Sequence, residues 1–206
     1  MEAGNRRLVF FDLECAGLDP KRHPIIQIAA IAVDEALEPI EAFEAKLRFD
    51  VQRANKNSLR KNHYHPGIWA KEGREPEEIA RTFAEFLRRH ATIPMMGATG
   101  SSYAVAQLVA HNADFDGSFL QAWYERFGVY LPARRQVLCT LQRAMWFFSE
   151  QTRQSPKDFK LATLCHFFAV PFHAASAHEA LGDVLATIQL YKSIFRAVSS
   201  PLCQAA

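Results

Sequence analysis

The sequence predicts an α/β protein built on a mixed sheet. Three stretches near the N-terminus, residues 7–14, 25–34 and 42–49, have the composition and spacing of strands. After residue 76 the chain alternates between helical and strand patterns. A meander followed by alternating helices and strands favours a mixed sheet flanked by helices. The chain has 206 residues, 49% of them hydrophobic, so we expect a single domain over residues 1–206.

The three early strands differ in how they meet solvent. Residues 7–14 and "IIQIAAIAVD" (25–34) are mostly apolar, as buried strands are. The stretch "AFEAKLRF" (42–49) instead alternates apolar and polar residues, which indicates a strand with one wet face.

A helix is predicted from Pro76 to near His90, because proline is favoured in the first helical turn and an apolar stripe follows. The stripe consists of Ile79, Phe83, Phe86 and Leu87. The remaining elements follow in alternation. We expect a short strand at 103–112, a helix at 114–128 stopped by Gly128, a strand at 137–139, and helices at 140–149, 160–168 and 178–196.

Two connecting segments have unusual compositions. Residues 51–71 contain no Asp or Glu but several basic side chains, with Tyr64 and Trp69 between them. The basic residues are Arg53, Lys56, Arg60, Lys61 and Lys71. This combination is found where proteins contact phosphates and stack on bases, and equally in a solvated connector. "GATGSS" (97–102) lacks the Gly-Lys-Ser/Thr ending of a phosphate-binding loop, so we interpret it as a turn.

Composition narrows the cellular setting. No apolar run reaches the roughly 20 residues that span a bilayer, and only "MEAGNRR" precedes the first strand, so we expect a soluble, cytoplasmic protein without a signal peptide. The four cysteines are Cys15, Cys139, Cys165 and Cys203. They form no Cys-x-x-Cys pair, which predicts neither a disulfide framework nor a zinc site.

Two carboxylates, Asp12 and Glu14, end the first predicted strand. Because side chains alternate along a strand, both acids lie on the face that also carries Leu8 and Phe10. Neighbouring half-buried carboxylates repel each other and are costly unless paired or bound to metal. The pattern therefore favours an external cation, although solvated acids are also common at strand ends.

Two later stretches add further acids. "HNADFD" (111–116) sets Asp116 at a junction of strand and helix, and "HEALGD" (178–183) sets His178 five residues before Asp183. Taken singly, an Asp in a first helical turn complements the helix dipole, and a His after a loop is commonly a surface residue. The indication of function comes from the order of the three motifs along the chain.

With these motifs the sequence resembles the DEDDh exonucleases, the family of bacterial proofreading subunits, ribonuclease T, oligoribonuclease and the Trex-type enzymes. The matching motifs are "FDLECAGLD", "VAHNADFD" and "SAHEALGD". The resemblance implies a ribonuclease-H-like fold with a mixed five-stranded sheet whose second strand is antiparallel to its neighbours. It also implies release of nucleoside 5′-monophosphates from 3′ ends of single-stranded nucleic acid, with DNA favoured over RNA.

The resemblance assigns Asp12, Glu14, Asp116 and Asp183 to two divalent metal ions and His178 to the role of general base. Carboxylate oxygens suit Mg²⁺ or Mn²⁺, and an imidazole can accept a proton near neutral pH. Asp12 is the candidate that bridges both ions, whereas Asp116 is expected to act partly through water. With four acids engaged by metal, the rest of the chain has a positive excess that suits a polyanionic substrate.

Substrate contacts are implied for Cys15, Ala16, Gly17, Leu18, His111 and Asn112. Many relatives carry two Thr after the Glu, so the hydroxyl is missing here and backbone N–H groups of residues 15–17 are expected to bind the terminal 3′-hydroxyl or phosphate. Leu18 would wedge under the last base, and His111 and Asn112 would organise the turn and touch the nucleotide. A reactive thiol at Cys15 is disfavoured, since no basic residue neighbours it in sequence.

The spacing of His178 and Asp183 also bears on the last helix. Five residues at about 100° each would set the two side chains far apart around a regular helix, so we expect His178 before the helix or at its frayed start. A capping box formed by Ser176 and Glu179 would begin the helix earlier.

Two alternatives stay open at this point. One is an exoribonuclease that trims structured RNA or consumes short oligonucleotides, as oligoribonuclease does; the 2′-hydroxyl distinguishes its substrate locally. The other is a catalytically silent adaptor that binds nucleic acid. Retention of four acids and a His argues against the adaptor, because unneutralised acids repel phosphate.

Overall fold

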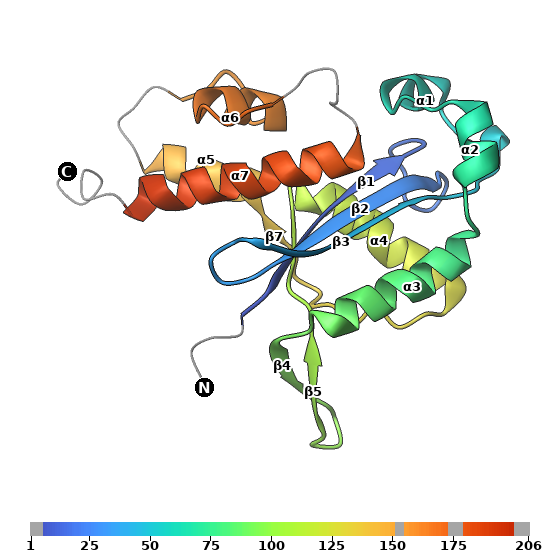
Figure 1. Ribbon diagram of the computed structural model, residues 1–206, viewed down its shortest axis with the longest axis horizontal. Coiled ribbons are helices and arrows are strands. Elements are labelled where there is room, and N and C mark those ends of the chain that lie inside the picture. Colours follow the sequence, from blue (N-terminus) through green and yellow to red (C-terminus); the bar gives the residue numbers. More distant parts are fainter. Residues whose placement is uncertain (1–5, 151–154, 173–178, 200–206) are drawn as a thin grey trace.

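A five-stranded sheet organises the computed structural model, which describes residues 6–150, 155–172 and 179–199 (Figure 1). The strands, in spatial order, are β3 (Pro39–Lys46), β2 (Ile25–Val33), β1 (Leu8–Cys15), β6 (Leu108–Ala110) and β7 (Leu138–Cys139). β2 is antiparallel to β1 and to β3, whereas β6 is parallel to β1 and β7 is parallel to β6. The predicted mixed sheet, with its antiparallel second strand, is confirmed.

Helices cover both faces of this sheet. α3 (Pro76–Arg89) and α4 (Ala113–Phe127) pack on one face, and α7 (Ala180–Ser199) crosses the other. α5 (Thr140–Ser149) and α6 (Leu161–Phe167) pack against α7 in a third cluster (Figure 1). The predicted stripe of α3 is buried in full, and Gly128 ends α4 with a φ of 60°, a conformation that glycine adopts without strain.

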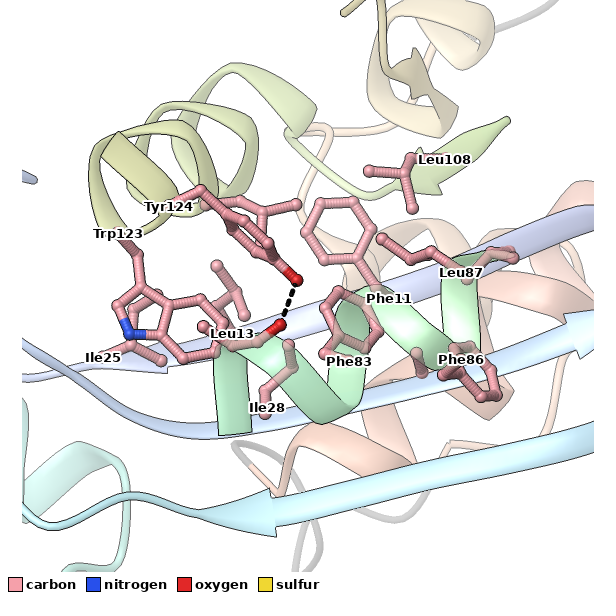
Figure 2. Packing of buried hydrophobic residues seen from close by; sticks show 14 of the residues in the cluster. Phe11, Leu13, Ile25, Ile28, Phe83, Phe86, Leu87, Leu108, Trp123 and Tyr124 are labelled. Atoms are coloured by element: carbon pink, nitrogen blue, oxygen red, sulfur yellow. Dashed lines mark hydrogen bonds between the residues drawn. The ribbon is translucent and has the colours of Figure 1, made fainter. Parts of the chain in front are cut away.

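The core under α3 and α4 is rich in aromatic side chains that contact one another (Figure 2). Phe83 contacts Phe43 and Phe86, with ring centroids 5.1 and 5.8 Å away. The Tyr124 hydroxyl donates a 2.8 Å hydrogen bond to the carbonyl of Ala80, which joins α4 to α3. These contacts fix both helices on the sheet.

Two expected elements are wrong in detail. The single strand predicted at 103–112 is two strands: β5 (Ser102–Val105) pairs with β4 (Ile93–Met96) in a separate hairpin, and only β6 joins the main sheet. The turn predicted at 97–102 closes that hairpin. The third strand lies at Pro39–Lys46 instead of 42–49, because its register is set by pairing with β2.

Residues 51–71 are largely helical instead of an open loop. They contain a 3₁₀ turn (Val51–Arg53), α1 (Lys56–Lys61) and most of α2 (Pro66–Glu72). The aromatic residues expected to stack on bases are inside the segment: Trp69 is only 6% exposed, and its ring centroid lies 5.1 Å from that of Tyr64. Trp69 is therefore not available to stack on bases in this conformation, and Tyr64 is half-buried against it.

The described residues contain no helix long and apolar enough to cross a membrane. Cys15, Cys139 and Cys165 are free thiols, and Cys203 lies outside the described residues. α7 begins at Ala180, two residues later than predicted, and Glu179 precedes it. Ser176 and His178 lie outside the described residues.

Candidate active site

A cavity of about 240 Å³ opens at the carboxyl end of β1. It is lined by Asp12, Leu13, Glu14, Cys15, Gly17, Leu18, Ser58, Lys61, Asn62, His111, Asn112, Phe115, Asp116 and Asp183. The four acids assigned to metal are thus brought together from β1, α4 and α7. Ala16 is buried behind the cavity and does not line it.

The alternation of β1 delivers two of the acids. Val9, Phe11 and Leu13 enter the core under α3 and α4, whereas Leu8 and Phe10 pack toward α7. Asp12 and Glu14 follow on this second face, as predicted. Asp183, in the first turn of α7, meets them there: carboxylate oxygens of the three residues all lie within 4.8 Å of one another.

Asp116 reaches the cavity from the other side of the sheet. The last register pair between β1 and β6 is Phe10 with Val109, so β1 continues beyond its parallel neighbour. The N–H of Leu13 consequently has no strand partner at that edge and donates a 3.1 Å hydrogen bond to Oδ1 of Asp116. The short β6 therefore makes the opening that α4 fills with a carboxylate.

Burial and mutual repulsion raise the pKa of every acid on β1. The pKa of Asp12 lies well above its ordinary range because of burial, then because of Asp116, Glu14 and Asp183. Burial and the charges of Asp183 and Asp116 raise the pKa of Glu14 to about 8. Burial raises that of Asp116 to about 7, against the stabilising hydrogen bond from Leu13. A carboxylate cluster of this kind favours either protons or a cation.

The donor set fits a hard divalent cation. Among the described residues, the candidate ligand atoms that lie within 4.8 Å of one another are carboxylate oxygens of Asp12, Glu14 and Asp183, and oxygen ligands suit Mg²⁺ and Mn²⁺. The Cys15 thiol is no alternative ligand, because its side chain is buried in the core under α3 and α4 and burial raises its pKa. This also argues against a reactive thiol.

The first residues after β1, Ala16 and Gly17, contact Pro24 and His23 in the same loop. The N–H of Ala16 donates a 2.9 Å hydrogen bond to the carbonyl of Pro24. We expected this N–H to bind the substrate, but it is already used within the protein. Gly17 lies against the ring of His23, which a Cβ at position 17 would overlap. Leu18, by contrast, is 81% exposed at the cavity rim.

His111 and Asn112 shape the turn between β6 and α4. His111 Nε2 donates to the carbonyl of Phe159 at 3.0 Å, which leaves Nδ1 as the acceptor for Thr140 Oγ1 at 2.9 Å. Burial lowers the pKa of His111 and keeps the ring neutral. Asn112 adopts a left-handed conformation, φ 60°, in which Asn is well tolerated. Both ring nitrogens of His111 are used by the protein, which favours its expected structural role over contact with nucleotide.

Sequence reasoning did not assign three polar cavity residues, Ser58, Lys61 and Asn62, to the site. Asn62 is buried, and its amide donates to the carbonyl of Cys15 at 3.0 Å. The N–H of Asn55 donates to the carbonyl of Ala16 at 2.7 Å. These bonds attach α1 to the end of β1, and Lys61 of α1 lines the cavity that holds the acids. The basic composition of 51–71 was the available signal.

The exonuclease family model of the RNase T type matches residues 9–96 and 101–191. The chain belongs to this exonuclease family. The resemblance to the DEDDh exonucleases seen in the motifs is confirmed, and with it the interpretation of the chain as an enzyme of the 3′–5′ exonuclease class.

Curated relatives differ in how much of their length they share with this chain. Ribonuclease T of Klebsiella pneumoniae is 31% identical over 90% of this chain and 83% of its own. The PolC-type DNA polymerase III of Caldanaerobacter subterraneus is 28% identical over 89% of this chain but only 11% of its own. The chain thus spans about a ninth of that polymerase.

Solved structures confirm the fold. Exonuclease I of E. coli in complex with a dT13 oligonucleotide superposes with a TM-score of 0.73 at 17% identity, over 97% of this chain and 43% of that one. A zinc-bound complex of the same enzyme with single-stranded DNA gives a TM-score of 0.72 at 17% identity, over 97% and 42%. At this identity the likeness concerns the ribonuclease-H-like exonuclease fold alone.

Proposed function

We propose that this protein removes nucleoside 5′-monophosphates from the 3′ end of single-stranded nucleic acid in a reaction that requires divalent metal. The observation that carries the proposal is the cluster of Asp12, Glu14 and Asp183, with carboxylate oxygens within 4.8 Å, in a chain of the exonuclease family. Asp116 shares their cavity. Such a cluster would be repulsive, and would repel a phosphate, unless cations neutralised it.

Asp12, Glu14, Asp116 and Asp183 would hold two ions, Mg²⁺ or Mn²⁺, with Asp12 as the shared ligand. When bound, two such ions lower the pKa of a water and stabilise the attacking and leaving oxygens of a phosphodiester. His178, five residues before Asp183, is the proposed general base, and it lies outside the described residues. Its imidazole would take the proton of the attacking water near neutral pH.

Other residues of the cavity would position the substrate. Lys61 lines the same cavity as the acids and would pair with a phosphate of the terminal nucleotide. Exposed Leu18 would lie beneath the last base. The N–H groups of Cys15 and Gly17 remain the backbone candidates for the terminal 3′-hydroxyl, since that of Ala16 is used by Pro24.

DNA is the first candidate substrate and RNA the second. The single-stranded DNA in the exonuclease I complexes supports DNA for a chain of the same fold. The likeness to ribonuclease T, at 31% identity over most of both chains, favours RNA. The two candidates differ by the 2′-hydroxyl, so matched oligonucleotides separate them.

The test is an end-labelled assay on DNA and RNA strands of the same sequence and graded length. We expect stepwise shortening from the 3′ end with Mg²⁺ or Mn²⁺, none with EDTA, and none with Asp12→Ala. Full-length substrate in every lane, with wild type and Asp12→Ala alike, would refute the proposal. Binding that ignores EDTA without nucleotide release would indicate the non-catalytic adaptor instead.

A further inference from the structure

A second cavity, of about 270 Å³, lies beside α4 and has no lining residue in common with the acid cavity. It is lined by Pro24, Ile25, Arg48, Phe49, Asp50, Arg53, Pro76, Trp123, Arg126 and Phe127. Three arginines, Arg48, Arg53 and Arg126, therefore line a cavity to which the exonuclease chemistry assigns no role.

Two of these arginines, Arg53 and Arg126, donate hydrogen bonds to the same carbonyl oxygen. Arg53 Nη2 and Arg126 Nη2 each lie 3.5 Å from the carbonyl oxygen of Lys21, to which both donate. Arg53 is further fixed by two hydrogen bonds to the carbonyl of Arg22, of 2.9 and 3.2 Å. Burial and the nearby charge of Arg53 lower the pKa of Arg126. Two like charges are thus confined near each other.

The surrounding acids do not neutralise this pair. Arg48 is the arginine with a carboxylate partner, since its Nη1 lies 3.0 Å from Glu75. Asp50 accepts a 2.9 Å hydrogen bond from the N–H of Gln52. Within residues 6–150, 155–172 and 179–199, no carboxylate lies within salt-bridge distance of Arg53 or Arg126. The cavity keeps a positive excess.

A lining residue of this cavity also carries a buried, neutral hydrogen-bond donor without an acceptor. Trp123 lines the cavity and is 4% exposed, and its Nε1–H has no acceptor among the described residues. Its indole forms one end of the aromatic cluster under α4 (Figure 2). A buried donor without an acceptor is costly, and an anion in the cavity is one group able to accept its hydrogen bond.

We propose that this cavity binds a backbone phosphate of the nucleic acid outside the acid cavity. Guanidinium groups are the side chains best matched to phosphate oxygens. The loop after β1 links the two sites: Gly17 and Leu18 line the acid cavity, and Lys21 supplies the carbonyl between the arginines. The inference rests on the proposed function for the identity of the anion, and it predicts a longer footprint than the acid cavity alone.

Binding to fluorescent oligonucleotides in EDTA tests this proposal without any hydrolysis. We expect Arg126→Gln to weaken binding of a single strand of about 12 nucleotides several-fold, and to reduce the slope of log affinity against log salt by about 0.7. Arg53→Gln/Arg126→Gln should lose more. A duplex with a 3′ overhang shows which strand supplies the bound phosphate. If Arg126→Gln weakens binding of this duplex but not of the single strand, the phosphate belongs to the paired strand.

Arg81→Gln is the matched control, because Arg81 is exposed on α3 and pairs with Glu77 at 2.7 Å. Equal losses in this control and in Arg126→Gln, or no loss in Arg126→Gln on either probe, would overturn the proposal. A nitrophenyl ester of a nucleoside 5′-monophosphate has no upstream phosphate, so Arg126→Gln should cleave it with unchanged kcat and KM. Failure of wild type to shorten the end-labelled oligonucleotides with Mg²⁺ or Mn²⁺ would refute the proposed function and leave the EDTA binding result valid.

Discussion

The two faces of β1 are built for different purposes. Under α3 and α4, Val9, Phe11 and Leu13 continue the core to the end of the strand. Toward α7, Phe10 packs against Tyr191 with ring centroids 5.5 Å apart, and then the apolar packing stops at Asp12. One strand therefore supplies cohesion on one face and a charged cluster on the other.

This difference shows how the fold supports a repulsive site. Buried carboxylates with raised pKa values oppose folding when they are ionised without a cation. The aromatic cluster on the opposite face contains no charged side chain, and its aromatic polar groups are the Tyr124 hydroxyl and the Trp123 indole N–H, so no cation is needed to neutralise it. Changes on the two faces should therefore separate activity from stability.

The largest effect on activity is expected from the charged face. Glu14→Gln keeps the shape of the side chain but removes a carboxylate from the cluster, so the rate of nucleotide release should fall at least about 100-fold. Because the substitution also removes repulsion, the metal-free protein should melt at a higher temperature at pH 8. Steady-state kinetics and calorimetry measure the two effects.

Glu85→Gln provides the control, because Glu85 is exposed on α3. It should change neither quantity. Retention of wild-type rates by Glu14→Gln would show that the acid cavity is not where catalysis occurs.

On the apolar face, Phe83→Ala should reverse the pattern. It leaves a cavity in the aromatic cluster, which typically costs about 3–5 kcal/mol and should lower the melting temperature by roughly 10 °C. Below the transition, kcat should be retained. Denaturant unfolding gives the free energy, with Phe195→Ala, a half-exposed position on α7, as the comparison. Similar losses in both variants would contradict the assignment of Phe83 to the core.

A further effect concerns the pH dependence of stability. Glu14 has a pKa raised from 4.5 to about 8, so between these values the folded, metal-free protein binds a proton that the unfolded chain releases. Its contribution is therefore present below about pH 4.5 and lost as pH rises toward 8. In EDTA the melting temperature should decline over this window, by about 2–4 °C for each kcal/mol.

Mg²⁺ at pH 8 should restore stability, because it binds the folded state. Glu14→Gln should show a shallower decline than wild type in EDTA. An equally steep decline in the variant would place the titrating group elsewhere.

Local patterns predicted most of the secondary structure. The stripe in residues 76–90 and the apolar run of 25–34 reflect which face of each element is buried, and burial follows from side-chain chemistry alone. The incorrectly predicted elements are those whose structure depends on pairing or packing with residues distant in sequence. The strand at 103–112 divides because β5 pairs with β4 instead of the main sheet, and the short helices of 51–71 are stabilised by packing of Tyr64 and Trp69.

Three statements stay predictions. They are that residues 1–206 form one domain, that two ions bind, and that His178 is the general base.

The sequence by itself determined that Asp12 and Glu14 share a face, because the alternation of a strand is local geometry. It also determined the family, through the order of three motifs. Only the tertiary structure decided that Asp116 is anchored by the free N–H of Leu13, that His111 is tied to Thr140, and that Arg53 and Arg126 meet at Lys21. These contacts join residues that are distant in sequence. They depend on where β6 ends and on how α4 packs against the sheet, and neither can be derived from local sequence patterns.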